Sequence, residues 1–486
     1  MNTFSPINQI PSEIFSLIPG YLNDECGTGL VTLTHVCRAW WEIFISHSSL
    51  WAPLNCRDVH KTLTYIERSK SFSLDIRLEK SKNKSYSHDA LYLVVPHISR
   101  LNSLSVSGPA DVIPDLVKHF SRSAPLLRKL EIDLTPNNRA PSFPATLSTE
   151  ISFLHELRLT RVAQLPLGNL PNFKVFRFHH DPGTADALFI TQLLDFFESA
   201  PLLSDIELHC SISIPATSNT PSGRVIAIPH LKKLTLYSPS AHSTLLKHLS
   251  LPIGSTLVLE YTLDGEDPSV LDNLEDFDSF SYLTYITSIS LLFGLGSKHV
   301  RFGGPSGQLY LSGIWTDKVP SLLATQCRFF GSLQRFNLSN TQRLTVTEYT
   351  SSSPPVFQTL VFMNNFRTLT LIKCKNLLFI CALNPEENNS GAVACPNLEE
   401  LVIHLKGFGW SYTPCLKEMA SARTRRYTKR PSITIIGLGN MLPKEKVFAL
   451  REYFPRVEYK VDVESPEWDD TNPSDGGRGD GLIPKT

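Results

Sequence analysis

The chain has 486 residues, and its 46 basic and 46 acidic side chains give a formal net charge of zero at pH 7. Without a basic excess, neither nucleic acid nor an anionic membrane surface is expected as the main partner. No segment approaches the roughly 18 consecutive apolar residues of a membrane-spanning helix, and the first residues lack the pattern of a signal peptide. We therefore expect an intracellular protein in the cytoplasm, the nucleus or both. Its length suits a small module plus one large or two medium domains.

The first helical pattern lies at residues 10–22. Pro11 suits the first position of a helix, where its missing N–H costs nothing, and Glu13 lies where a negative charge favours the helix dipole. Pro19 and Gly20 interrupt the pattern, and a proline inside a helix removes a backbone hydrogen bond, so we expect a kinked or shortened helix. The apolar residues at helical spacing are Ile14, Leu17, Ile18 and Tyr21, flanked by Phe15 and Leu22.

A second pattern follows the polar segment at residues 23–29 and predicts one helix with a single apolar face over residues 30–44. The polar residues 46–49 end it, and Leu50 and Trp51 add a large apolar pair. Some 42 residues are fewer than a lone hydrophobic core usually requires. We therefore expect an apolar surface that a second protein covers. The alternative is a helical cap that packs on the rest of its own chain.

The ordered string of residues 10–51 resembles the F-box, the segment that docks on Skp1 in cullin-based ubiquitin ligases. The resemblance rests on Ile10-Pro11-x-Glu13-Ile14-Phe15, His35-Val36-Cys37-Arg38-Ala39-Trp40 and Ser49-Leu50-Trp51, and it continues over residues 63–76 as in the F-box proteins abundant in fungi. It implies a Skp1-binding role for part of this segment and a mostly internal or linker-facing position for Leu50 and Trp51. The implied Skp1 contacts are Pro11, Ile14, Phe15, Ile18, Leu22, Val36, Cys37 and Trp40.

From about residue 100 a six-residue phrase of the type L-x-x-L-x-L recurs, often after a proline. The x positions are mostly polar, which indicates a strand with one buried and one exposed face. Amphipathic helical patterns between the phrases complete strand–helix units that must stack to bury their apolar sides. The phrases begin at Leu101, Leu127, Leu154, Phe173, Leu203, Leu231, Leu333, Phe366 and Leu398, and the helical patterns lie at residues 115–120, 187–197, 245–249 and 322–330.

The phrases resemble irregular leucine-rich repeats, because their central residues from Leu130 to Leu234 step by 27, 19, 30 and 28 residues. The expected fold class is α/β: a short N-terminal helical F-box followed by an irregular leucine-rich-repeat-like solenoid, a horseshoe of strand–helix units. The expected divisions are an F-box-like domain (residues 1–55), a linker with the first solenoid elements (56–99), the repeat domain (100–463) and a disordered tail (464–486).

Two parts of the predicted solenoid differ from the regular repeat: an irregular middle segment and the end of the array. In residues 255–315 acidic and glycine-rich stretches weaken the repeat, although short strands are still predicted at residues 257–261, 286–291 and 309–311. The first interpretation there is a loop-rich solenoid segment, and the second is a break between two sub-arrays. At the end of the array we expect a last strand at residues 432–436 and a capping helix at residues 444–454.

The sequence offers little catalytic or ligand chemistry. It contains no G-x-S-x-G, P-loop or H-E-x-x-H motif, and its nine cysteines form no C-x-x-C pair, so we expect no catalytic residue, metal or cofactor and several buried, reduced thiols. The densest cluster of ligand-type residues is His179-His180-Asp181, which is a binding contact on the concave rim, a metal or catalytic site, or a solvated loop. The basic run at residues 423–430 is a nuclear-import patch or a solvated loop.

The leading hypothesis is a non-enzymatic adaptor whose N-terminal helices dock on a Skp1-like protein, and through it on a cullin. Trp40, Ile14 and Ile18 would be buried anchors, and the solenoid would hold an unidentified target protein. The alternatives are an interaction scaffold without ligase activity and an enzyme with its polar groups in residues 255–315. The candidate target-binding positions are Arg128, Lys129, Glu131, His155, Glu156, Arg158, Lys232 and Lys233.

Overall fold

A computed structural model of the chain shows a mixed α/β protein with parallel sheets and several helices. The described residues fall into two compact units, one up to Thr262 and one from Leu263 onward. The helical patterns at 115–120 and 322–330, the phrase at Leu333 and the tail 464–486 lie outside the described residues. The structure describes residues 11, 14, 18, 28–56, 58–79, 88–108, 124–134, 153–162, 165, 169–180, 188–210, 212–213, 224–237, 245–252, 254–263, 288–294, 297–304, 307–315, 340–347, 360, 365–372, 378–385, 394–405, 412–426, 431–438 and 444–462.

The first unit begins with helices α2 (Thr28–Thr34) and α3 (Arg38–Ser46) and the 3-10 turn η2 (Ser48–Trp51). The single helix predicted over residues 30–44 is therefore wrong. The amides of His35 and Val36 donate to carbonyls three residues back, which tightens and ends α2. The chain then passes through an extended residue, with φ −160° and ψ 171°, before α3 starts.

Trp51 joins these helices to α4 (Val59–Ser69). It is fully buried, and its indole Nε1 donates to the Phe44 carbonyl oxygen at 2.8 Å. The Tyr65 ring meets the indole edge-on at 4.9 Å, and the Arg68 guanidinium lies 4.4 Å from the indole centroid. A large aromatic ring with its one polar atom satisfied is a favourable core residue. Trp51 is thus internal, which is the first of the two positions that the resemblance implies.

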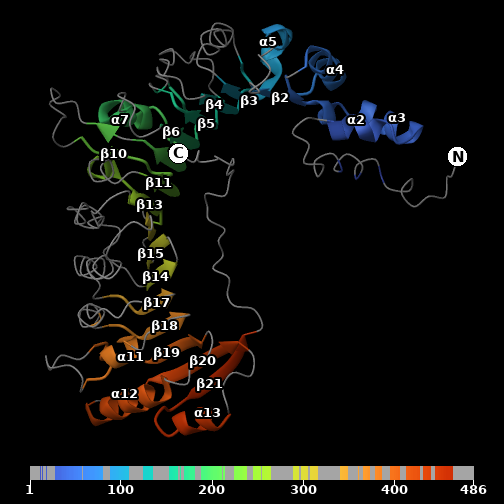
Figure 1. Ribbon diagram of the computed structural model, residues 1–486. Helices are drawn as coiled ribbons and strands as arrows, with labels where there is room; N and C mark the ends of the chain where they lie inside the picture. The colour runs from blue at the N-terminus through green and yellow to red at the C-terminus, as the bar shows by residue number, and fades with distance from the viewer. Residues whose placement is uncertain are drawn as a thin grey trace, which may run out of the picture. The chain divides into compact units, whose positions relative to one another are not determined.

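Nine strands of the first unit form one parallel ladder in which each strand is bonded to the next along the chain (Figure 1). All eight neighbouring pairs are parallel. Two short parallel pairs, β7 with β9 and β10 with β12, lie outside this ladder. The ladder strands are β1 (Pro53–Asn55), β2 (Leu74–Glu79), β3 (Leu101–Gly108), β4 (Lys129–Leu134), β5 (Glu156–Thr160), β6 (Val175–His179), β8 (Asp205–His209), β11 (Lys233–Leu236) and β13 (Thr256–Leu263). The remaining elements are α5 (His88–Val94), η3 (Val95–Arg100), β7 (Leu188–Phe189), α7 (Ile190–Glu198), β9 (Ile212–Ser213), β10 (Ile226–Ala227) and β12 (Leu249–Ser250).

The predicted phrases are strands, but most of the strands begin two residues into the phrase. The first apolar residue instead closes a turn: the Leu127 amide donates to the Ala124 carbonyl at 3.0 Å, with Pro125 inside the turn. Proline is preset for the second position of such a turn. The same bond recurs before β6, β8, β11 and β19, at Leu170–Phe173, Ala200–Leu203, Ile228–Leu231 and Cys395–Leu398.

Helix α7 shows how these units bury their apolar sides. The Phe196 ring of the helix lies 4.5 Å from the Phe176 ring of β6 and 5.6 Å from the Phe173 ring. All three side chains are fully or almost fully buried. The helix predicted over residues 187–197 is confirmed for residues 190–197, but Leu188 and Phe189 form the short strand β7 instead. Helix α7 covers the buried face of the strand beside it.

In the second unit, β14 to β16 form an antiparallel meander, and β14 also pairs in parallel with β17. From β17 to β21 every strand is parallel to the next along the chain (Figure 1). The strands are β14 (Ser288–Gly294), β15 (Ser297–Gly304), β16 (Gly307–Trp315), β17 (Arg343–Thr347), β18 (Thr368–Ile372), β19 (Glu400–Leu405), β20 (Ser432–Leu438) and β21 (Val457–Asp462), and the helices are α11 (Leu378–Ala382), α12 (Tyr412–Arg426) and α13 (Lys444–Leu450).

Within residues 255–315 the short strands predicted at 257–261, 286–291 and 309–311 overlap β13, β14 and β16. The loop-rich interpretation is wrong where the structure describes these residues, because β13 and the meander are regular strands. One of the glycines that suggested loops has a packing role. A Cβ on Gly303 would lie 2.6 Å from the Oγ of Ser288 on the facing strand, closer than side chains tolerate. That glycine indicates a close approach of two strands rather than a loop.

The end of the second unit carries two further corrections. The strand at Ser432 is not the last, because β21 follows the capping helix α13 and pairs with β20. The basic run begins inside α12, not in a loop. There Arg423 is buried and donates to the carbonyl oxygens of Cys395 at 2.7 Å and Ala394 at 3.1 Å. At least one of the predicted nuclear-import cations is therefore a core residue.

Candidate partner-binding surfaces

Helix α3 has two apolar faces. Trp40 and Phe44 lie one turn apart and are buried, with their rings edge-to-face at 5.8 Å. Trp41 is 48% exposed, because a helix turns each residue about 100° from the last and neighbouring tryptophans cannot face the same core. The Trp41 amide donates to the carbonyl of the exposed Cys37 at 2.9 Å, so these two residues occupy one face. Val36, 55% exposed, directly precedes them.

The structure separates the residues that the resemblance implies as Skp1 contacts. Val36 and Cys37 are exposed, as are Pro11 and Ile14, the latter at 50%, and Ile18 is partly exposed. Trp40 is only 8% exposed, so the anchor role implied for it is not open to a partner in this structure. Phe15 and Leu22 lie outside the described residues.

Trp41 is the surface residue that the sequence interpretation missed. The signal was the adjacent pair Trp40-Trp41 itself, since one of two neighbouring aromatic residues on a short helix must leave the core. The Arg38–Glu42 ion pair beside it, at 2.9 Å and largely exposed, supplies a polar border. An exposed aromatic residue with apolar neighbours and a polar rim is typical of a protein-binding surface.

The eight predicted target-binding residues lie on β4, β5 and β11 or directly before those strands. Four of them neutralise one another across neighbouring strands. Lys129 pairs with Glu156 at 3.3 Å, and Arg158 pairs with Glu131 at 3.5 Å. These side chains are partly exposed, and such pairs contribute under about 1 kcal/mol each. The other four are exposed or partly exposed: Arg128, His155, Lys232 and Lys233.

Two aspartates on the same face have raised pKa values. Burial raises the pKa of Asp205, opposed by the positive charges of Lys233 and Arg177. Burial also raises the pKa of Asp133, although Arg161, 3.3 Å away, opposes the rise. The desolvated carboxylates and their cations alternate across the ladder, so the centre of this face is charged but balanced.

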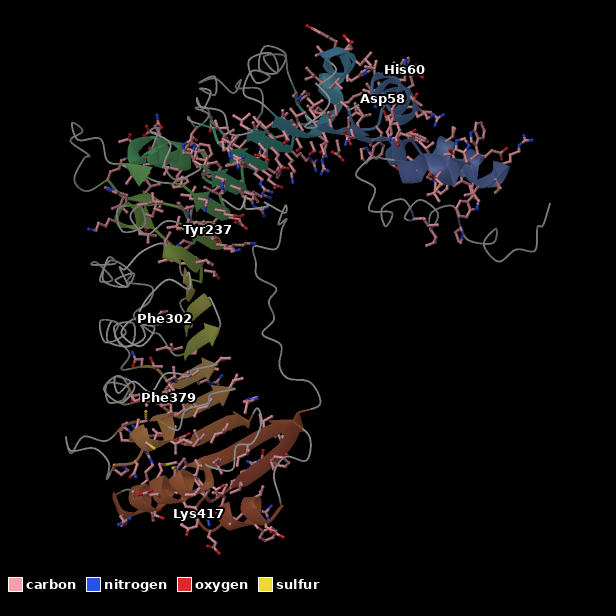
Figure 2. The ribbon with its side chains drawn as sticks, viewed as in Figure 1. Asp58, His60, Tyr237, Phe302, Phe379 and Lys417 are labelled. Carbon is pink, nitrogen blue, oxygen red and sulfur yellow. The ribbon has the colours of Figure 1, made fainter. Side chains whose placement is uncertain are left out.

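The predicted His179-His180-Asp181 cluster divides. The ring of His179 stacks on His209 of the next strand at 4.0 Å, and Tyr237, labelled in Figure 2, meets His209 edge-on at 5.1 Å. His180 is buried and stacks on Phe178. Asp181 lies outside the described residues. Among the residues that the structure describes, no three His, Cys, Asp or Glu side chains are placed to share a metal ion.

None of the described helices has the length and apolar character needed to cross a membrane. A scan against models of protein families found no match to this chain, and a search of curated proteins likewise found none.

Proposed function

We propose that the chain is a substrate-recognition adaptor of a Skp1–cullin–F-box ubiquitin ligase. In this proposal the N-terminal helices dock on Skp1, and the two parallel ladders belong to an irregular leucine-rich-repeat solenoid that holds a target protein. The adaptor needs no chemistry of its own, because it acts by bringing the target close to the conjugating enzyme of the ligase.

The observation that carries the proposal is the outward apolar face of α3. Val36, Cys37 and Trp41 are exposed even though Trp40, Phe44 and Trp51 give the same segment an internal core. Leaving this tryptophan and valine exposed to water forgoes stabilisation that burial would supply, roughly 1.5–3 kcal/mol for a fully buried large apolar side chain. A second protein that covers this face would recover it.

The solenoid part of the proposal is supported by strand order. In the ladder of the first unit, and from β17 to β21 in the second, each strand is bonded to the next ladder strand along the chain, and short turns precede many of them. A ladder built in this way grows by repetition and leaves one row of side chains per strand facing outward. Such a face suits extended contact with another protein.

The test is a charge substitution at exposed positions. We predict that Val36→Glu with Trp41→Glu lowers the affinity of the full chain for purified Skp1 by about 30-fold or more, the effect of losing a central aromatic contact worth about 2 kcal/mol. Titration calorimetry measures it. Both substituted residues are exposed. Truncating the buried Trp40 instead would open a cavity and lower the free energy of unfolding by about 3–5 kcal/mol, which would confuse loss of binding with loss of folding.

The matched control is Phe72→Glu with Phe153→Glu, two aromatic side chains that are 47% and 52% exposed elsewhere on the first unit. We expect it to bind Skp1 as the wild type does. Equal affinity of wild type and the Val36/Trp41 variant would refute the docking surface. If Skp1 binds but no cullin is captured with it, the chain is an interaction scaffold and the ligase part of the proposal fails.

A further inference from the structure

The residues directly before five neighbouring strands of the first unit's parallel ladder form a row that we call the strand-start row. Main-chain hydrogen bonds of 2.7–2.9 Å connect each of them to the next. They are therefore neighbours in space and in register, although 19 to 30 residues separate them in the sequence. The row consists of Arg128 before β4, His155 before β5, Lys174 before β6, Ser204 before β8 and Lys232 before β11.

The strand-start row is basic and uncompensated. Arg128, Lys174 and Lys232 are exposed, and within the part of the chain that the structure describes none of them forms an ion pair. The row contains no carboxylate. The next rows differ, because Glu131 faces Arg158 and Glu207 faces Arg177 there. Positive charge is thus concentrated where these strands begin, in a line that runs across the ladder, although the chain as a whole is neutral.

Resting on the proposed function, we infer that the strand-start row binds an acidic, extended segment of the target protein, laid across the strands. Neighbouring strands lie roughly 4.8 Å apart, so the three cations recur at about 10 Å. A peptide in the polyproline II conformation advances about 3.1 Å per residue with three residues per turn, so acidic side chains at every third position lie on one face about 9 Å apart and would meet the cations in turn. His155 and Ser204, between the cations, can contribute hydrogen bonds to the segment.

The charges favour a peptide over a nucleic acid. Glu156 and Asp205 follow the row by one residue each and would repel a continuous run of phosphates. A peptide with spaced acidic side chains can place neutral residues beside those carboxylates. The same spacing gives the site a means of selecting among acidic segments.

The probe is a fluorescent ten-residue Gly/Ser peptide with glutamates at three positions of spacing three, and a second version with phosphoserines in their places. We expect the full chain to bind at least one of them at low salt, and Arg128→Glu with Lys174→Glu and Lys232→Glu to weaken that binding at least tenfold. A peptide with three adjacent glutamates should bind more weakly than the spaced one. Fluorescence anisotropy gives the affinities.

The control variant reverses three exposed cations elsewhere: Lys70→Glu, Arg343→Glu and Arg367→Glu. It changes the net charge equally, and Arg343 and Arg367 also lie at strand starts, in the second unit. We expect the control variant to bind the peptide less than threefold more weakly than the wild type does. An equal loss in both variants, no binding of either peptide by the wild type, or tighter binding of an oligothymidine with the same charge would overturn the inference. Skp1 capture by the Arg128/Lys174/Lys232 variant should stay at the wild-type level, which separates this outcome from failure of the docking proposal.

Discussion

Asp58 shows how one side chain fixes the start of the helix that holds Trp51. Its carboxylate Oδ1 accepts the Lys61 amide at 2.9 Å and so satisfies one of the open donors of α4 (Figure 2 labels Asp58). This backbone hydrogen bond lowers the pKa of Asp58, although slight desolvation opposes it. Because α4 carries Tyr65 and Arg68 against the Trp51 indole, the cap also supports the N-terminal core.

We predict that Asp58→Ala lowers the free energy of unfolding of α4 by about 1 kcal/mol. Asp58→Ser should keep most of the stabilisation that the cap provides, because serine also caps helices well. Amide hydrogen exchange of α4 measures the loss. Since the folded pKa lies below the ordinary value of 3.8, the advantage of aspartate over alanine is complete above that value and disappears as the pH falls through the folded pKa. A difference that persists unchanged at lower pH would contradict this explanation.

At the scale of the element, the alternation along each strand decides stability. In β5 the side chain of Leu157 is buried and that of Arg158 is partly exposed, and the same alternation appears in β4, β6 and β8. The buried residues are stacked in register, as Leu130, Leu157 and Phe176 are. A slip of one residue would exchange the two faces of a strand.

Two alanine substitutions in β5 separate these faces. Leu157→Ala should cost about 2–5 kcal/mol, because it removes a buried side chain and leaves a cavity. Arg158→Ala should cost under about 1 kcal/mol, because its pair with Glu131 is partly solvated. Urea unfolding followed by circular dichroism compares them. Similar costs for the two variants would show that β5 is not half-buried as described.

For the whole molecule, the cysteines report exposure in both units. Burial raises the pKa of Cys56, Cys210 and Cys395 to about 12, whereas Cys37 is exposed. We predict that an alkylating reagent at pH 7.5 modifies Cys37 first among the described cysteines and leaves the three buried thiols unmodified until unfolding, since the thiolate is the reactive form. Skp1 should protect Cys37, and peptide mass spectrometry detects both effects. Rapid modification of Cys395 would contradict the packing of the second unit.

The sequence predicted the parts of this molecule that depend on local alternation. The phrases from Leu101 to Leu398 that fall in described residues are strands, because alternation over six residues decides which face is buried. It was harder to predict which side chains of one helix are buried. The periodicity placed Trp40 on an apolar stripe, but it did not show that Trp41 would remain exposed to solvent. Contacts between distant segments were not predictable. Nothing near Arg423 in the sequence indicates that carbonyls 28 and 29 residues away would hold its guanidinium.

The chain-ordered ladder also bears on how such a protein changes over generations. Leu130 and Leu157 occupy equivalent rungs, so excising the 27 residues 130–156 would join Lys129 to a leucine in the place of the one lost. Only the two flanking rungs would meet new neighbours. Unequal recombination could in this way lengthen or shorten the ladder by one strand, while the N-terminal helices stay as they are.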